Sequence, residues 1–298
     1  MKAAIYLTGR FLNTASVVAP PLARRVAYTL FFRPTGRAPV HPREQDVHAA
    51  AVVGRVDLDG VPVTTYTWGD GDRPVLLVHG WSSRGSRFAG MVADLLDRGY
   101  SPVTFDAPGH GDSGGSSTNL LQYERIMRLL QEQHGDFAAI VAHSFGVPCA
   151  FHALRTGLRA GHLVAIGGPA EFEHLITEFT RQLRLRPALA EHLRERSVRD
   201  IGVTDLWQRF SSTFEPEALT IPLLIVHDTE DDVVGVDHAR RIHAAYPGSQ
   251  LLITSGLGHR RVLGDPRIVG PVGAFLDAQA PTLAGPRNIP DGGPQSAR

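Results

Sequence analysis

The sequence predicts an α/β fold, in which a doubly wound and mostly parallel sheet has an antiparallel N-terminal hairpin and a small helical cap. Three observations carry this prediction. Short, continuous apolar runs recur along the chain and lead through turns into stretches of helical periodicity. Two alternating segments precede these runs, and one charged helical segment interrupts them. Strands that are apolar on both faces are typical of a parallel sheet covered by helices.

The hairpin is expected at residues 52–59 and 61–68. Apolar and polar residues alternate there on both sides of the pair Asp59-Gly60. An Asp-Gly pair is favoured in two-residue hairpin turns because both positions tolerate a positive φ. The sheet is therefore expected to begin with two antiparallel strands.

The parallel part of the sheet is expected from residue 74 onward. Its strands are predicted at residues 74–79, 101–105, 137–142, 162–166, 222–226 and 250–254. Amphipathic stretches that predict covering helices lie at residues 87–98, 120–133 and 236–246. Repeated strand–helix units of this kind form parallel sheets with helices on both faces.

One segment departs from this alternation. Residues 171–217 are rich in charge and predict helices between the sixth and seventh strands. Their larger apolar side chains are Phe172, Leu175, Phe179, Leu183, Leu185, Trp207 and Phe210. We therefore expect this segment to form a small helical cap over the site, within one α/β domain that spans residues 51–278.

Two further segments flank the predicted domain. Residues 1–50 predict an N-terminal amphipathic helix at about 21–32 and a linker with several Pro residues and a Gly. This helix is expected either to pack on the domain or to make shallow contact with a membrane surface. Residues 279–298 are rich in Pro, Gly and polar residues and are expected to be disordered.

Composition narrows the functional classes. The 298 residues include 30 basic and 30 acidic ones, so no overall field favours nucleic acid. Cys149 is the only cysteine, which excludes an intrachain disulfide and fits a reducing, cytoplasmic location. No run approaches the roughly 20 apolar residues of a transmembrane helix. Without metal-ligand spacing or a dinucleotide-binding glycine motif, neither a metal nor a cofactor is expected.

The strongest local signal surrounds Ser144. The fifth predicted strand ends in Ala142-His143-Ser144-Phe145-Gly146 and leads into a helical stretch. A nucleophile elbow requires small residues two positions before and two after the serine, because the strand-to-helix turn is tight. Ala142 stands where Gly is usual, and Gly146 meets the second requirement. A serine that simply caps the helix would give the same short pattern. The presence or absence of a base and an acid elsewhere in the chain therefore distinguishes a nucleophile from a cap.

Partners of the required types follow in the chain. The loop after strand 222–226 carries several carboxylates, and the loop after strand 250–254 ends at His259. A serine hydroxyl needs a base within hydrogen-bond reach, and that base needs a carboxylate on its other nitrogen. The order serine, acid, histidine places all three at the carboxyl edge of the sheet.

With these motifs the chain resembles the α/β-hydrolase family over residues 52–278. The resemblance implies that Asp231 is the acid in the loop that begins at His227, with Asp232 as the alternative and Asp228 shaping the loop. It also places an oxyanion loop at His79-Gly80-Trp81, so the backbone N–H groups of Trp81 and Phe145 are expected to bind the oxyanion.

Several other polar residues near these motifs are expected to be structural. They are His79, Asp106, His110 and His143. Cys149, in the helix after the elbow, is expected to be a small buried hydrophobe.

The resemblance implies a serine hydrolase that cleaves carboxylic esters through an acyl-enzyme, with Ser144, Asp231 and His259 as the catalytic residues. A serine at the elbow argues against the epoxide and halide chemistry of relatives with a carboxylate there. A thioesterase, an acyltransferase or a perhydrolase would use the same three residues, and a non-catalytic binding protein could keep the fold. The expected partner is a small ester with an apolar acyl or aromatic group. Neither nucleic acid nor a transmembrane segment is expected, and peripheral membrane contact stays open.

Overall fold

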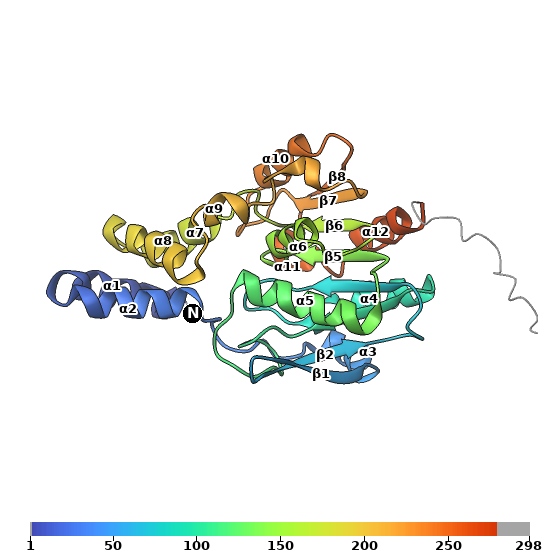
Figure 1. Cartoon of the computed structure of the whole chain (residues 1–298), viewed down its shortest axis with the longest axis horizontal. Helices are drawn as coiled ribbons and strands as arrows, with labels where there is room; N and C mark the ends of the chain where they lie inside the picture. The colour runs from blue at the N-terminus through green and yellow to red at the C-terminus, as the bar shows by residue number, and fades with distance from the viewer. Residues whose placement is uncertain (1, 279–298) are drawn as a thin grey trace, which may run out of the picture.

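The computed structural model describes residues 2–278, and within them the chain forms an eight-stranded sheet (Figure 1). The strand order is β1-β2-β4-β3-β5-β6-β7-β8. Strands β1 (Val52–Leu58) and β2 (Val61–Thr67) form an antiparallel hairpin, and β2 pairs antiparallel with β4. All other neighbouring strands are parallel. The predicted fold class is confirmed.

The parallel strands lie close to their predicted positions. They are β3 (Pro74–Val78), β4 (Ser101–Phe105), β5 (Ala139–His143), β6 (Leu163–Ile166), β7 (Leu223–Asp228) and β8 (Gln250–Thr254). Strand β7 is two residues longer than predicted at its carboxyl end, because His227 and Asp228 still pair with Ile253 and Thr254 of β8. The strand was predicted from a continuous apolar run, so its polar end at His227 and Asp228 was not predicted.

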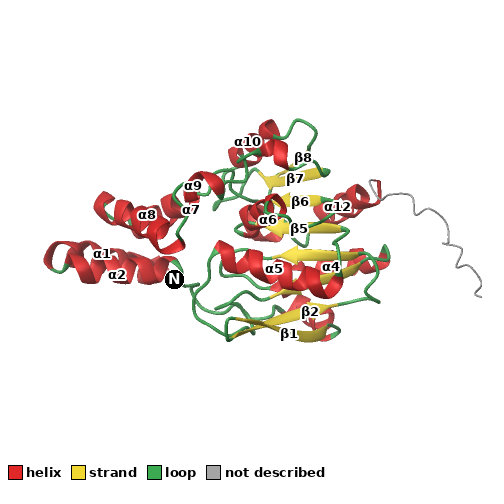
Figure 2. Ribbon diagram, viewed as in Figure 1, coloured by secondary structure: helices red, strands yellow, loops and turns green. Residues whose placement is uncertain are grey.

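Helices cover both faces of the sheet (Figure 2). They are α4 (Ala89–Asp97), which follows the 3-10 turn η2 (Gly85–Phe88), α5 (Leu120–His134), α6 (Gly146–Arg155), α10 (Asp237–Ala245), α11 (Gly258–Arg261) and α12 (Pro266–Ala278). Side chains of β3 alternate between two cores. Leu76 and Val78 pack with α5 and α6, whereas Val75 and Leu77 pack with α4 and α12. Because both faces of β3 are buried, its sequence is apolar at every position.

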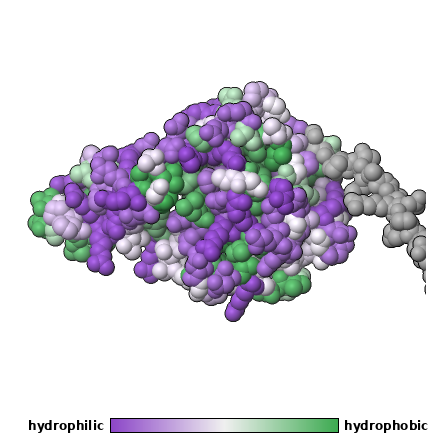
Figure 3. Space-filling view, viewed as in Figure 1, coloured by the Kyte–Doolittle hydropathy of each residue, from purple (hydrophilic) through white to green (hydrophobic). Residues whose placement is uncertain are grey.

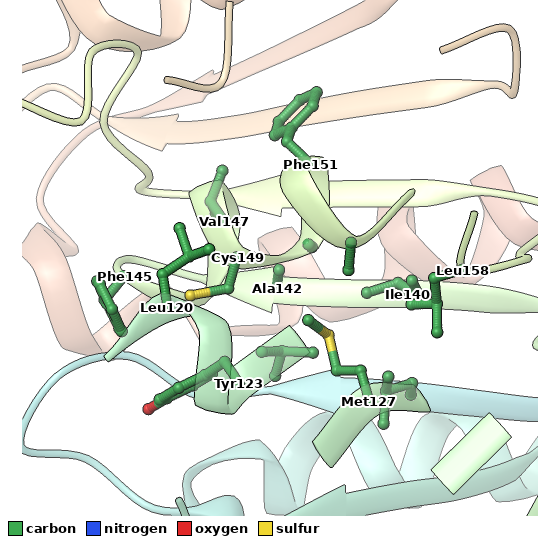
Figure 4. Packing of buried hydrophobic residues seen from close by; sticks show 14 of the residues in the cluster. Leu120, Tyr123, Met127, Ile140, Ala142, Phe145, Val147, Cys149, Phe151 and Leu158 are labelled. Carbon is green, nitrogen blue, oxygen red and sulfur yellow. The ribbon is translucent and has the colours of Figure 1, made fainter. Parts of the chain in front are cut away.

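Figure 4 shows the first of these cores close to the elbow. Leu120 and Tyr123 of α5 face Ala142 of β5 and Cys149 of α6 in one buried cluster. Cys149 is completely buried, as predicted, and burial raises the pKa of its thiol well above the ordinary value. The helix that follows the elbow is thus fixed by apolar packing on its inner side.

The sheet reverses its direction of growth at β3. The chain passes through α4 to β4 on one side of β3, and then through α5 to β5 on the other side. At such a switch point the two loops that leave the carboxyl ends of the strands separate and leave a crevice, which is where ligands bind in open α/β sheets. Both the loop at Gly80 and the turn at Ser144 leave the sheet at this point.

The segment 171–217 is helical and lies between β6 and β7. It contains α7 (His174–Leu183), α8 (Pro187–Ile201), α9 (Leu206–Arg209) and the short 3-10 turn η3 (Pro216–Ala218). Phe172 and Phe210 are buried against the core beside the elbow, while α7 and α8 extend away from the sheet (Figure 1).

The N-terminal region differs from its prediction. The predicted helix at about 21–32 is present as α2 (Pro20–Phe31), but a further helix, α1 (Lys2–Val18), precedes it, and the two form a helical hairpin with Ala19 between them. Polar residues such as Arg10 and Asn13 obscured α1 in the sequence. The region from Phe32 to the sheet also holds η1 (Pro42–Glu44) and α3 (Gln45–Ala49), where a linker was expected. Residues 279–298, predicted to be disordered, lie outside the described residues.

The helical hairpin packs on α7 and α8 (Figure 1). Its small buried cluster consists of Leu12, Ala15, Ala23 and Ala27 with Ile176, Leu189 and Leu193. Gly9 allows close approach, because a Cβ at this position would lie 1.9 Å from the carbonyl oxygen of Leu183. Asn13 clamps the turn between α7 and α8, since its Nδ2 donates to the Arg184 carbonyl at 2.8 Å and its Oδ1 accepts from the Arg186 amide at 3.0 Å. Among the described residues, no helix combines the length and hydropathy needed to cross a bilayer.

Candidate active site

Ser144 occupies the strained turn between β5 and α6. Its φ is 54°, in the left-handed region that a residue with a Cβ adopts only when the surrounding structure imposes it. The Ser144 amide donates to the Ile166 carbonyl of β6 at 2.9 Å, which fixes this backbone. Gly146 is required here, because a Cβ would lie 2.5 Å from the Val78 carbonyl oxygen. The methyl group of Ala142 fits within the core and is fully buried.

Three side chains that are distant in sequence form one hydrogen-bonded chain at this turn. The Nε2 atom of His259 lies 2.9 Å from Oγ of Ser144, and its Nδ1 lies 2.7 Å from Oδ2 of Asp231. The residues come from the turn after β5, the loop after β7 and helix α11 after β8. Because these strands are parallel neighbours or nearly so, their carboxyl ends bring the three loops together.

Asp231 is held as a buried carboxylate. Its side chain is only 2% exposed, and its Oδ1 accepts from the amides of Val233 at 2.9 Å and Val234 at 2.8 Å. Burial by itself would raise the pKa of this carboxyl. The hydrogen bond from His259, the positive charge that His259 can carry and the two amides outweigh burial, so the Asp231 pKa lies below its ordinary value. Asp232, the alternative, is exposed and lies outside this chain of hydrogen bonds.

Asp228 fixes the two loops that carry Asp231 and His259. Its carboxylate accepts from the amides of Glu230, Leu257 and Gly258 and from the hydroxyl of Thr254, at distances from 2.8 to 3.1 Å. Burial would raise its pKa, but these donors outweigh burial and lower the Asp228 pKa from 3.8 to about 2. The loop-shaping role expected from the sequence thus has a physical basis in these four hydrogen bonds.

We expect Asp228→Asn to lower the free energy of unfolding by about 2–4 kcal/mol at neutral pH, because an amide NH₂ would face backbone donors. Folding lowers the pKa of Asp228, so its stabilising effect is complete above about pH 4 and is lost as the pH falls toward 2. Urea unfolding of both proteins across this range measures the effect. Asp232→Asn, which removes an exposed carboxylate from the same loop, should leave stability unchanged. A difference between wild type and Asp228→Asn that stays constant from pH 7 to 2 would contradict the assignment.

The backbone of the loop after β3 lies beside Ser144. A Cβ on Gly80 would lie 2.7 Å from Cβ and 3.2 Å from Oγ of Ser144, so the backbone of this loop lies directly against the serine. The Trp81 ring packs edge-on against Phe145, with centroids 5.4 Å apart. Within the described residues, neither the Trp81 amide nor the Phe145 amide donates to a protein acceptor.

The nearby histidines are buried and neutral. Burial lowers the pKa of His79 to about 4 and that of His110 and His143 to about 3. His79 accepts from the Ala107 amide at 3.0 Å and His110 from the Ser82 amide at 3.0 Å, so both histidines tie the loop after β3 to the loop after β4. His143 pairs its Nε2 with the carbonyl of His259 at 2.8 Å.

Two supporting residues were missed by the sequence analysis. His227 packs beside the acid, with its Nε2 at 2.7 Å from the Val234 carbonyl and 3.5 Å from Oδ2 of Asp231. Arg84 is buried and pairs with Asp106 at 3.3 Å, in a network that also includes the Tyr66 hydroxyl. His227 stood in the motif that marks the acid loop, but no sequence signal distinguished Arg84 from the other arginines.

A row of aromatic rings leads from the elbow toward the helical segment. Centroids lie 5.4 Å apart between Trp81 and Phe145, 6.4 Å between Phe145 and Phe172, and 5.8 Å between Phe172 and Trp207. Trp81 and Trp207 remain partly exposed. The side chains that lead from the elbow to the helical segment are therefore apolar and aromatic. Among the described residues, no three His, Cys, Asp or Glu side chains gather as a metal site would require.

The fold and the elbow together define a class of protein. A sequence profile of the Alpha/beta hydrolase family matches residues 75–270, which include all three side chains of the hydrogen-bonded chain. The protein therefore belongs to the alpha/beta hydrolase family. Family and fold together support hydrolase activity.

Individual relatives carry different names. The chain is 28% identical over 116 residues to a non-heme haloperoxidase of Rhodococcus erythropolis, over 38% of this chain and 35% of that protein. It is 38% identical over 55 residues to a non-heme chloroperoxidase of Kitasatospora aureofaciens, over 18% of this chain and 20% of that protein. The matched part thus spans about a third or less of each relative.

Solved structures match over far more of the chain. An esterase from Pyrococcus furiosus superposes with a TM-score of 0.62 at 18% identity, covering 83% of this chain and 98% of that chain. A bromoperoxidase from Bacillus anthracis superposes with a TM-score of 0.58 at 19% identity, covering 76% and 99%. At such identities the likeness shows the fold alone.

Proposed function

We propose that the protein is a serine hydrolase that cleaves carboxylic esters through an acyl-enzyme, with Ser144 as nucleophile, His259 as base and Asp231 as the orienting acid. The observation that carries the proposal is the hydrogen-bonded chain from Ser144 through His259 to Asp231, at distances of 2.9 and 2.7 Å, on a serine with a left-handed backbone. A serine that only capped α6 would need neither the strain nor the partners.

The reaction follows from these positions. His259 Nε2 takes the proton from Oγ of Ser144 as the oxygen attacks the ester carbonyl carbon, and the carbonyl π electrons move onto its oxygen. Collapse of this intermediate breaks the bond to the alcohol, which leaves with the proton from His259. Water then attacks the acyl-enzyme by the same path and releases the acid. Asp231 keeps Nδ1 of His259 protonated, so that Nε2 is free to accept.

The amides of Trp81 and Phe145 are proposed to bind the oxyanion. Both belong to backbone that lies against Ser144, and α6 directs its N-terminus toward the same place. Such donors, fixed before the reaction, stabilise charge that develops only in the transition state, and one of them contributes about 10²–10³ in turnover.

The substrate is proposed to be a small ester with an apolar acyl or aromatic group. Its apolar part would lie along the row of rings that Trp81, Phe145 and Phe172 form next to the elbow. Burial of each methylene in such a wall stabilises a complex by about 0.8 kcal/mol.

The experiment is turnover of a p-nitrophenyl ester series combined with the intact mass after treatment with a fluorophosphonate. We expect a single adduct, and a kcat/KM that rises with acyl length by up to about fourfold per methylene until the wall is filled. Slow ester turnover with fast thioester turnover would favour a thioesterase instead. A folded protein that neither reacts with the probe nor cleaves any ester would refute the proposal and favour a ligand-binding role.

A second candidate is perhydrolysis, and the haloperoxidase relatives are the reason to test it. In this reaction hydrogen peroxide, in place of water, attacks the acyl-enzyme and accepts the acyl group. The products are a peroxy acid and free Ser144, and the same three residues act as in hydrolysis. Peroxy acid formed from an ester and hydrogen peroxide, at a rate that competes with hydrolysis, would assign this activity.

A further inference from the structure

The helical hairpin of α1 and α2 carries an apolar surface that no described residue covers. The exposed fractions there are 49% for Tyr6, 63% for Leu7, 53% for Phe11, 60% for Val17, 76% for Val18 and 50% for Leu22. These six are the majority of the large apolar side chains that are exposed in the described chain. Figure 3 shows hydrophobic surface gathered at the end of the molecule that the hairpin forms. We call these six side chains the hairpin patch.

The patch lies on a helix whose other side is already anchored. Leu7, Phe11 and Val18 follow one another at helical spacing along the outer face of α1. The inner face holds Gly9 and Asn13, which bind α1 to α7 and to the turn that follows it. A helix that is apolar on both faces is typical of a buried position. Since α1 is fixed on its inner side, the outer face presents a formed apolar surface for a partner.

The charged residues of the hairpin itself are all basic. Residues 1–43 contain no Asp or Glu, and their cations are Lys2, Arg10, Arg24, Arg25, Arg33, Arg37 and Arg43. Among the described residues, Arg10, Arg24 and Arg25 form no ion pair, although the whole chain carries equal numbers of basic and acidic residues. The exposed Arg10 lies on α1 between Leu7 and Phe11, and the exposed Arg24 and Arg25 lie on α2 shortly after Leu22.

We propose that the hairpin patch docks the protein on an anionic lipid surface. Apolar side chains of an interfacial helix enter the boundary between headgroups and acyl chains, while basic side chains pair with the anionic headgroups. A second copy of this chain is a poorer occupant, because an isologous contact would bring the same unpaired arginines face to face.

Docking has a consequence for the site, and this consequence rests on the proposed function. The hairpin packs on α7 and α8, the helices next to the aromatic row from Trp207 to Phe145 (Figure 1). A docked protein therefore holds its helical segment near the lipid, with the hairpin between the two, and esters with apolar acyl groups that partition into that surface are concentrated on the side of the molecule where the helical segment lies. Docking itself requires no catalysis.

Flotation with lipid vesicles tests the proposal on the full chain. One set of vesicles contains phosphatidylcholine alone, and the other an equal mixture of phosphatidylcholine and phosphatidylglycerol. We expect the wild type to float with the anionic vesicles, to bind the neutral ones at least tenfold more weakly, and to be released as salt rises.

Three double variants identify the surface. Leu7→Ser/Phe11→Ser removes apolar side chains that make no contribution to the buried cluster, and Arg24→Gln/Arg25→Gln removes two unpaired cations. Each should weaken binding to the anionic vesicles by at least about tenfold. The matched control Val52→Ser/Val53→Ser removes two exposed apolar side chains, 70% and 61% exposed, from β1 and should leave binding unchanged.

Three results would overturn the proposal. They are equal binding to both kinds of vesicle, no flotation of the wild type, or a dimer in light scattering that Leu7→Ser/Phe11→Ser dissociates, which would assign the patch to a second copy. Turnover of a water-soluble ester in the absence of vesicles should be equal in wild type and all three variants. If the wild type did not turn over the water-soluble ester, the proposed function would be contradicted, whereas the conclusion on docking would be unaffected.

Discussion

Replacing Ser144 by Ala should lower ester turnover roughly 10⁴- to 10⁶-fold and abolish the fluorophosphonate adduct. The change removes the Oγ that lies 2.9 Å from His259 Nε2. The amides proposed to bind the oxyanion remain, so a small residual rate above that of water is expected. The fold should be retained, because the substitution removes only the side-chain hydroxyl and places no larger group near Gly80. Intact mass and kcat on a p-nitrophenyl ester measure both effects.

Ser255→Ala is the matched control for this prediction. Ser255 is an exposed serine in the loop that leads to His259, and within residues 2–278 its hydroxyl bonds only the exposed Glu230. The control should keep both labelling and turnover. Retention of more than a few per cent of the activity in folded Ser144→Ala would mean that another group is the nucleophile.

Replacing Asp231 by Asn should lower kcat by about 10⁴-fold with little change in KM. The reason lies in the two amides of Val233 and Val234 that donate to Oδ1. An Asn side chain keeps its carbonyl oxygen on these donors, so its NH₂ group faces His259 Nδ1. The imidazole must then accept at Nδ1 and carry its proton on Nε2, where it can no longer take a proton from Ser144.

Asp232→Asn distinguishes the two carboxylates that the sequence left open. It changes an exposed neighbour in the same loop, with the same loss of one charge, and should keep turnover near the wild-type level. Kinetics of both variants over a range of ester concentrations give the comparison. Loss of kcat in Asp232→Asn with normal Asp231→Asn would exchange their roles.

The sequence alone predicted the parallel strands and most of the covering helices. Both faces of β3 are buried and all its residues are apolar, and β5 is apolar up to His143, so both strands leave a continuous signal in the chain. The pattern failed where polar groups are satisfied by tertiary contacts. Strand β7 ends in His227 and Asp228, and helix α1 contains Asn13, which bonds across 171 and 173 residues to the α7–α8 turn.

Some features of the candidate site could likewise be predicted from the sequence, and others could not. The strand-to-helix turn at Ser144 and the order serine, acid, histidine are local properties of the chain, so they were visible in the sequence. The choice between Asp231 and Asp232 depends on which side chain turns inward to meet His259. The distance of 2.7 Å to Asp231, two backbone donors on its other oxygen and the exposure of Asp232 favour Asp231.

What the sequence by itself determined is therefore the class of fold, the position of the elbow and the types of residue that could act with it. Periodicity and turn geometry depend on neighbouring residues, and chain order can be read directly along the sequence, so none of these requires knowledge of tertiary contacts. Only the tertiary structure decided that α1 exists and docks on the helical segment, that Asp228 ties the acid and histidine loops together, and that one face of the hairpin stays apolar and uncovered. Each of these depends on contacts between segments far apart in the chain, where a polar residue satisfied by a distant partner cannot be told from one that faces water.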